Sequence, residues 1–143
     1  MDLLDAAIQI AKSPGQTIHE VMSLKVKDIP TIAEQYDFTH AFCAFLDGFL
    51  QSPNKMELIA EQPLLGRMEP REYCMLASAV HKLANDNSLE VPHWVFEKTY
   101  TLQEPVYALD TKNPDYRAFL RETSPIEYRL RNLFYGENVL KRV

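Results

Sequence analysis

The chain has 143 residues, of which 46% are hydrophobic, and a formal net charge of −5; this length and content suit one domain with a substantial core. The chain has only four glycines and nine prolines, with seven Phe and seven Tyr, which argues against a disordered or low-complexity chain. The acidic balance argues against general nucleic-acid binding, because that activity needs a basic face whose contacts release counterions from phosphate.

The cysteines and the apolar runs indicate where in the cell the protein is expected. Cys43 and Cys74 both fall in expected helix interiors, and the N-terminus lacks the basic, apolar and small-residue order of a secretory signal. No apolar run approaches the roughly 20 residues that cross a bilayer. The best run, residues 41–50, is interrupted by Asp47 and Gly48. We therefore expect a reduced, cytoplasmic protein that does not enter a membrane.

The N-terminal part reads as short helices. Apolar residues at three- and four-residue spacing predict an amphipathic helix over residues 2–12, which Ser13-Pro14-Gly15 ends. The pattern returns more weakly over residues 17–25. Pro30 then interrupts it, and another short turn is expected around residues 29–33.

Two long helices dominate the middle of the chain. The first runs from about Ile32 or Tyr36 to Leu50 and carries a broad stripe of phenylalanines, and the second follows Pro70 and reaches Ala84. A short helix after Ser52-Pro53 connects them. Two such stripes predict an antiparallel pair packed face to face.

The composition and the hydrophobic periodicity of the chain change after Leu89. Residues 89–112 are rich in Pro and aromatic residues but lack a long periodic segment, so we expect an ordered wrap over the helical pair. Asn113-Pro114 starts a short helix. Ser124, Pro125 and Glu127 predict a capped last helix with a capping box, which ends at Gly136 and leaves residues 139–143 as a last turn or short strand.

These elements predict a mainly α fold. We expect a single-domain helical bundle over residues 1–143, with the irregular wrap at residues 89–112 and short C-terminal helices.

Motifs that would carry chemistry are few. His40 and Cys43 on one helix, with Cys74 and His81 on the other, permit a zinc site, but structural zinc cysteines usually stand two to four residues apart. A reactive thiol needs an electropositive surrounding, which Glu72 beside Cys74 opposes. The sequence contains no Gly-x-Ser-x-Gly elbow, glycine-rich phosphate loop or His-Glu-x-x-His helix. We expect no metal, no cofactor and no catalytic residue.

Two features favour a contact surface. Trp94 beside Pro92 and His93 could anchor a partner, although a Trp among Val91, Val95 and Phe96 more often closes the edge of a core. The second feature is a basic edge formed by four arginines from two neighbouring helices, Arg117, Arg121, Arg129 and Arg131. Residues 113–143 hold six basic and four acidic side chains, whereas residues 1–112 hold nine and sixteen. Such an edge suits an acidic protein surface, and intramolecular ion pairs are its alternative.

From Phe42 onward the chain resembles small uncharacterised bacterial proteins. The resemblance rests on residues 58–63, Pro92-His93-Trp94-Val95, Glu104-Pro105-Val106-Tyr107, residues 124–134 and a closing Leu140-Lys141-Arg142. It implies kinship with standalone accessory proteins, or with proteins attached to a DNA-reading module, in toxin–antitoxin or regulatory neighbourhoods. It carries no catalytic residue over to this chain.

The sequence thus favours a protein that acts by protein–protein contact, as an antitoxin-like or regulatory accessory, through Trp94 and the four arginines. A protein partner is expected, and a homodimer stays open. One alternative is a transcriptional regulator with a helix-turn-helix in residues 2–34, whose few phosphate-binding side chains argue against DNA binding. A second alternative is a small hydrolase-like enzyme with a pocket between the helical pair and residues 89–112, using His40, His81 or His93 as a base.

Overall fold

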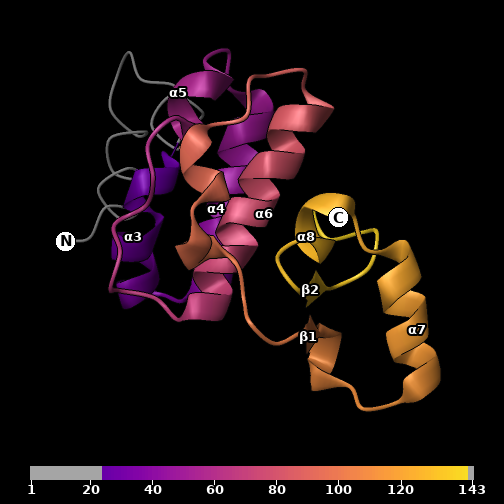
Figure 1. Cartoon of the computed structure of the whole chain (residues 1–143). Coiled ribbons are helices and arrows are strands. Elements are labelled where there is room, and N and C mark those ends of the chain that lie inside the picture. Colours follow the sequence, from indigo (N-terminus) through magenta and orange to yellow (C-terminus); the bar gives the residue numbers. More distant parts are fainter. Residues whose placement is uncertain (1–23, 142–143) are drawn as a thin grey trace. The chain divides into compact units, whose positions relative to one another are not determined.

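The computed structural model describes residues 24–141. Over this range the protein is mainly helical, with six α-helices, short 3-10 turns and one pair of two-residue strands (Figure 1). The prediction of a mainly α fold is confirmed. The helix expected at residues 2–12, residues 17–23 of the next expected segment, most of the expected helix-turn-helix and residues 142–143 lie outside the described part of the chain. Leu24 and Lys25, the end of the expected 17–25 segment, are not helical.

The chain forms two compact units, one ending at Glu69 and the other beginning at Pro70. The two predicted long helices are present as α4 (Phe38–Gln51) and α6 (Pro70–Asp86). They belong to different units, and their antiparallel packing remains a prediction, as does the single-domain organisation.

The first unit is built around α4. Its described part begins with a 3-10 turn (Val26–Asp28) and α3 (Ile29–Gln35), in which Pro30 occupies the first turn, where its missing N–H is not needed. Helix α3 packs against α4, and the short α5 (Lys55–Ile59) follows. The helical conformation is interrupted between α3 and α4, so the long helix starts at Phe38 rather than at Ile32 or Tyr36. Asp37 is the N-cap of α4, because its carboxylate accepts a hydrogen bond from the His40 N–H at 2.7 Å.

Helix α6 forms the base of the second unit. The 3-10 turns η2 (His93–Phe96) and η3 (Lys98–Tyr100) pack on it. Residues 89–112 therefore form ordered structure, and part of the predicted wrap lies on the second predicted long helix. The segment continues into β1 (Val106–Tyr107) and a third turn, η4 (Ala108–Asp110).

The C-terminal part differs most from the expectation. Helix α7 (Pro114–Thr123) begins as predicted, with the Asn113 side chain accepting from the Tyr116 N–H at 2.9 Å. Helix α8 (Ile126–Arg129) has only four residues, and the chain then turns into β2 (Leu133–Phe134). Strand β2 pairs in parallel with β1, with Val106 opposite Leu133. The sequence signals did not indicate this sheet.

The predicted capping box at Ser124 is wrong. The N-cap of α8 is Pro125, which makes no side-chain cap bond. The Ser124 hydroxyl instead donates to the Leu120 carbonyl at 2.6 Å and accepts from the Gly136 N–H at 2.9 Å. Glu127 accepts from the Asn85 side chain at 2.9 Å. Both side chains bond to partners outside α8, so the reciprocal capping box does not form.

Within residues 24–141, no helix combines the length and the apolar character needed to cross a bilayer.

Candidate functional site

The five predicted contact residues do not share one surface. Arg121 and Arg129 are exposed, and Arg117 is half-buried. Arg131 has only 1% of its surface exposed, and Trp94 is also buried. Arg131 is therefore not part of an exposed basic edge, and Trp94 offers little surface to a partner.

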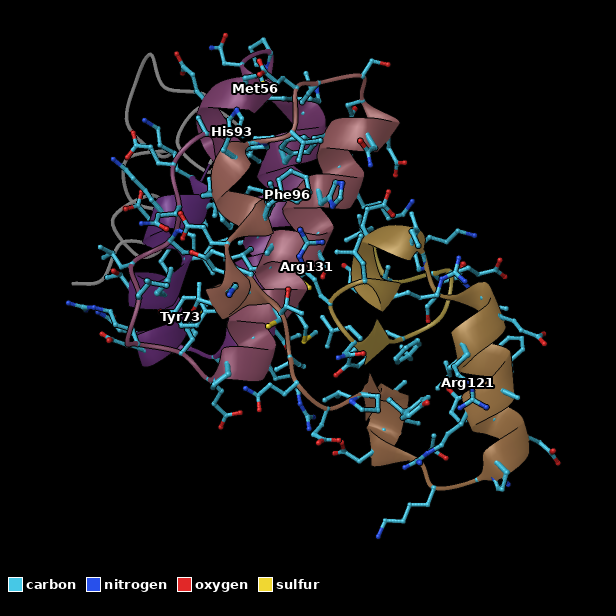
Figure 2. The ribbon with its side chains drawn as sticks, viewed as in Figure 1. Met56, Tyr73, His93, Phe96, Arg121 and Arg131 are labelled. Atoms are coloured by element: carbon cyan, nitrogen blue, oxygen red, sulfur yellow. The ribbon has the colours of Figure 1, made fainter. Side chains whose placement is uncertain are left out.

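Arg131 is an internal structural group. Its Nη1 donates to the Glu127 carbonyl at 2.7 Å and lies 3.2 Å from Nδ1 of His81, and its Nη2 donates to the Val95 carbonyl at 2.8 Å. Phe96 covers the guanidinium, with 6.0 Å between the central carbon and the ring centroid (Figure 2). Three elements of the second unit, α6, η2 and α8, are thereby joined by one side chain.

The electrostatics of this cluster follow from burial. Burial lowers the pKa of the Arg131 guanidinium to about 10, and Cys74, Glu127 and Tyr128 oppose the shift. The Nε atom is buried and has no hydrogen-bond partner among the described residues. A buried cation with an unbonded N–H group is costly to the folded state. Because its two Nη groups already contact two carbonyls and His81, the guanidinium holds these elements together and is not available to a ligand.

Trp94 is a buried core residue, as its apolar sequence neighbours favour. Its ring meets Tyr100 edge to face at 5.1 Å, and Tyr100 meets Tyr73 of α6 in the same manner at 6.5 Å. Such contacts stabilise aromatic cores. Trp94 therefore attaches η2 to the core of the second unit.

Arg117 and Arg121 converge on Tyr107 instead of forming an open edge. The Arg117 guanidinium lies over the Tyr107 ring at 4.6 Å, and Arg121 donates to the Tyr107 hydroxyl at 2.8 Å. Phe134 stacks on Tyr107 at 5.1 Å. The parallel pairing of β1 and β2 explains this contact, since Tyr107 and Phe134 are paired neighbours in the sheet. Two of the predicted arginines are thus held in fixed positions by an aromatic pair.

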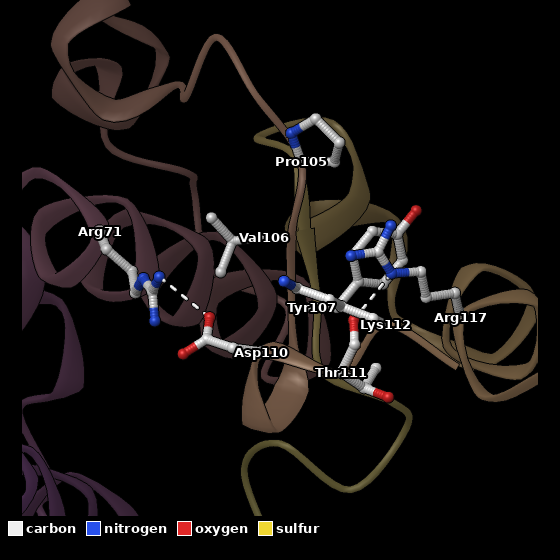
Figure 3. A pocket seen from close by; sticks show the side chains of 8 residues that line it. All are labelled: Arg71, Pro105, Val106, Tyr107, Asp110, Thr111, Lys112 and Arg117. Carbon is white, nitrogen blue, oxygen red and sulfur yellow. Dashed lines mark hydrogen bonds and ion pairs between the residues drawn. The ribbon is translucent and has the colours of Figure 1, made fainter. Parts of the chain in front are cut away.

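An open pocket lies beside this cluster (Figure 3). It has a volume of about 230 Å³. Its charged lining consists of Arg71, Asp110, Lys112 and Arg117, and its walls are completed by Pro105, Val106, Tyr107 and Thr111. Three cations and one carboxylate make the pocket locally positive, in contrast to the acidic chain as a whole.

The turn beside the pocket is strained. Leu109 and Asp110 follow one another with φ of 57° and 50°, a left-handed conformation that costs roughly 1–2 kcal/mol for each residue other than glycine. Leu109 is also 90% exposed. The Asp110 carboxylate lies 3.2 Å from Arg71, and this ion pair holds the turn to the start of α6.

Helices α7 and α8, which follow one another in the chain, both carry exposed apolar side chains. These two short helices carry four exposed large apolar side chains within fifteen residues, Tyr116, Phe119, Ile126 and Leu130. Tyr116 and Phe119 stack on each other at 6.3 Å. Arg121 and Arg129 are exposed on the same two helices. We call these six residues the α7–α8 surface.

Two of the imidazoles and one thiol are held by their surroundings. His40 bonds to the Asp37 carboxylate at 2.8 Å, and His81 bonds to Arg131. Burial raises the pKa of the Cys74 thiol to about 11, against the opposing effect of Arg131. Over residues 24–141, no three His, Cys, Asp or Glu side chains are grouped to hold a metal ion.

Sequence reasoning missed Arg71, Asp110 and Lys112. Their charges are ordinary in the sequence, and only the strand pairing and the left-handed turn bring them to one pocket. Asn113-Pro114 after Asp110 indicates a turn, which is the one local signal that could have drawn attention to this segment.

Comparisons with protein-family profiles, with curated proteins and with solved structures found no match to this chain.

Proposed function

We propose that this protein acts by binding another protein through the α7–α8 surface. The observation that carries the proposal is the concentration of four exposed large apolar side chains in residues 116–130. A scattered exposed apolar residue needs no explanation, whereas several on neighbouring elements are typical of an interaction site.

The composition of this surface also suits a protein interface. Aromatic residues and arginine are enriched at the centres of such interfaces. Tyr116, Phe119 and the exposed Arg121 all lie on α7, and the exposed Arg129 lies on α8. The partner would offer apolar pockets for Phe119 and Ile126 and carboxylates for the arginines. An antitoxin-like or regulatory accessory role is the form of this contact that the family resemblance implies, and a second copy of the chain is the alternative partner.

The test uses two matched double variants of the full chain. Phe119→Ser with Ile126→Ser alters the α7–α8 surface, and Leu50→Ser with Leu65→Ser alters the first unit. All four side chains are between 49% and 57% exposed, so the two variants remove similar exposed apolar area.

Each tagged protein is used to capture partners from its source cells, and the captured partner is then purified and titrated against the same variants. A partner that binds the wild type and the Leu50/Leu65 variant, but not the Phe119/Ile126 variant, supports the proposal. Equal binding by both variants would refute it. Sedimentation of the wild type and of the Phe119/Ile126 variant tests whether the partner is a second copy.

A further inference from the structure

The lining of the pocket beside Tyr107 holds more positive than negative side chains. Arg71, Lys112 and Arg117 face it with one carboxylate, Asp110, which leaves a local charge of two positive units. The pocket residues differ from the apolar α7–α8 surface, so an inference from them is independent of the proposed protein contact.

Arg117 is held in place while part of its guanidinium remains available. Its Nε donates to the Thr111 carbonyl at 2.8 Å, and the guanidinium lies over the Tyr107 ring. These contacts fix the side chain, and none of the hydrogen bonds found within residues 24–141 uses its two Nη groups. A planar pair of N–H donors in a fixed position is the arrangement that binds an oxyanion by two parallel hydrogen bonds.

Lys112 and Arg71 are the two other cationic hydrogen-bond donors that line the pocket. Lys112 is exposed, and its ammonium makes no ion pair with the described residues. Arg71 pairs with Asp110 at 3.2 Å, with both side chains substantially exposed. An exposed pair of this kind contributes only about 0–1 kcal/mol, so Arg71 can exchange Asp110 for a ligand of higher charge while it keeps its hydrogen bond to the Tyr135 side chain.

The size and the charge of the pocket select the ligand. A volume of about 230 Å³ lies below the roughly 300–1,000 Å³ of pockets that enclose a whole drug-sized ligand, so the pocket suits one functional group. A carboxylate would bring one negative charge and would compete with the tethered Asp110. A phosphate monoester brings close to two charges and three acceptor oxygens, which match the local charge and the three cations.

We propose that the pocket formed by Arg71, Lys112 and Arg117 beside Tyr107 binds the phosphate monoester group of a larger molecule. Arg117 would bind two of its oxygens, Lys112 would neutralise the third, and Arg71 would leave Asp110 to join them.

The experiment follows backbone amide shifts of the ¹⁵N-labelled full chain during titration with inorganic phosphate, at neutral pH and constant ionic strength. We expect saturable shifts in residues 105–112 and at Arg117, and the same shifts with sulfate. Acetate should require a several times higher concentration because it carries a single charge. Absence of a saturable shift in these residues, or equal binding of acetate, would overturn the proposal.

Three variants sharpen the test. Lys112→Gln should weaken phosphate binding about threefold, the factor typical of one exposed charge contact. Lys98→Gln makes the same change on an exposed lysine that does not line the pocket and should leave the affinity unchanged. Asp110→Asn should strengthen binding because it removes a like charge and releases Arg71. The proposal fails if Lys98→Gln matches Lys112→Gln, or if Asp110→Asn weakens binding.

A second arm identifies the source of the phosphate. A short phosphoserine peptide and glycerol phosphate are titrated separately. Saturable binding of either supports the phosphate site, and the tighter of the two assigns it to a protein or a small-molecule source. Failure of both probes would overturn the proposal even if inorganic phosphate binds.

Discussion

Arg131 and His81, fifty residues apart in the sequence, are joined by a 3.2 Å contact between Nη1 and Nδ1. A guanidinium has donors only, so Nδ1 of His81 must accept and the imidazole must be neutral, with its proton on Nε2. Burial and the nearby Arg131 charge lower the pKa of His81, whereas Glu127 acts in the opposite direction. The folded protein therefore resists protonation of this histidine.

We expect His81 to make the protein less stable in mild acid. The pKa of His81 is lowered from 6.5 in the folded state, so below that pH the unfolded chain binds a proton that the folded chain does not. The contribution is complete above the ordinary pKa and is lost as the pH falls toward the folded-state value. The measurement is the urea midpoint between about pH 7.5 and about pH 5.5, the range in which histidine titrates.

His81→Asn keeps an acceptor near the Nδ1 position and removes the titration, so it should flatten this dependence. His93→Asn, on an exposed histidine of η2, is the matched control and should keep the wild-type slope. If His81→Asn and the wild type lose the same stability over this range, the assignment to His81 is wrong.

Replacing Arg131 should destabilise the second unit strongly. Arg131→Ala leaves the Glu127 and Val95 carbonyls without their buried donor and opens a cavity, for which we expect a loss of about 3 kcal/mol in the free energy of unfolding. Arg129→Ala, on the exposed arginine two residues earlier, should change it by less than about 0.5 kcal/mol. Chemical denaturation of both variants checks this, and similar losses would contradict the internal role of Arg131.

Ser124 offers a second matched pair. Ser124→Ala removes the buried acceptor of the Gly136 N–H, and an unsatisfied buried donor costs about 1–3 kcal/mol. Thr123→Ala removes a hydroxyl with the same bond to the carbonyl four residues earlier, but no backbone donor loses its partner. We expect the Thr123 change to cost less than half as much in thermal or urea unfolding. A larger effect at Thr123 would show that the Gly136 contact is unimportant.

The two thiols should differ in reactivity. Only a thiolate attacks an alkylating agent, and burial raises the pKa of Cys74 to about 11, whereas Cys43 is partly exposed. Iodoacetamide should therefore modify Cys43 first and should reach Cys74 only when the chain is unfolded in urea. Mass spectrometry of Cys43→Ser measures Cys74 alone, and rapid labelling of that variant under native conditions would contradict the prediction.

Local sequence patterns determined most of α4 and α6 and the start of α7. The stripe of phenylalanines predicts α4, the periodicity after Pro70 predicts α6, and Asn113-Pro114 predicts the start of α7. These predictions hold because the bonds, caps and side-chain spacing of a helix involve residues within about four positions of each other.

Only the tertiary structure decided the region from Ser124 to Phe134 and the pocket beside Tyr107. Ser124 has the sequence of a helix cap, yet its hydroxyl is taken by Gly136. Arg131 reads as a surface cation and is instead held by Val95 and His81. These partners stand 12 to 50 residues away in the chain. Their burial and pairing depend on which strands and turns meet, and no local preference encodes that choice.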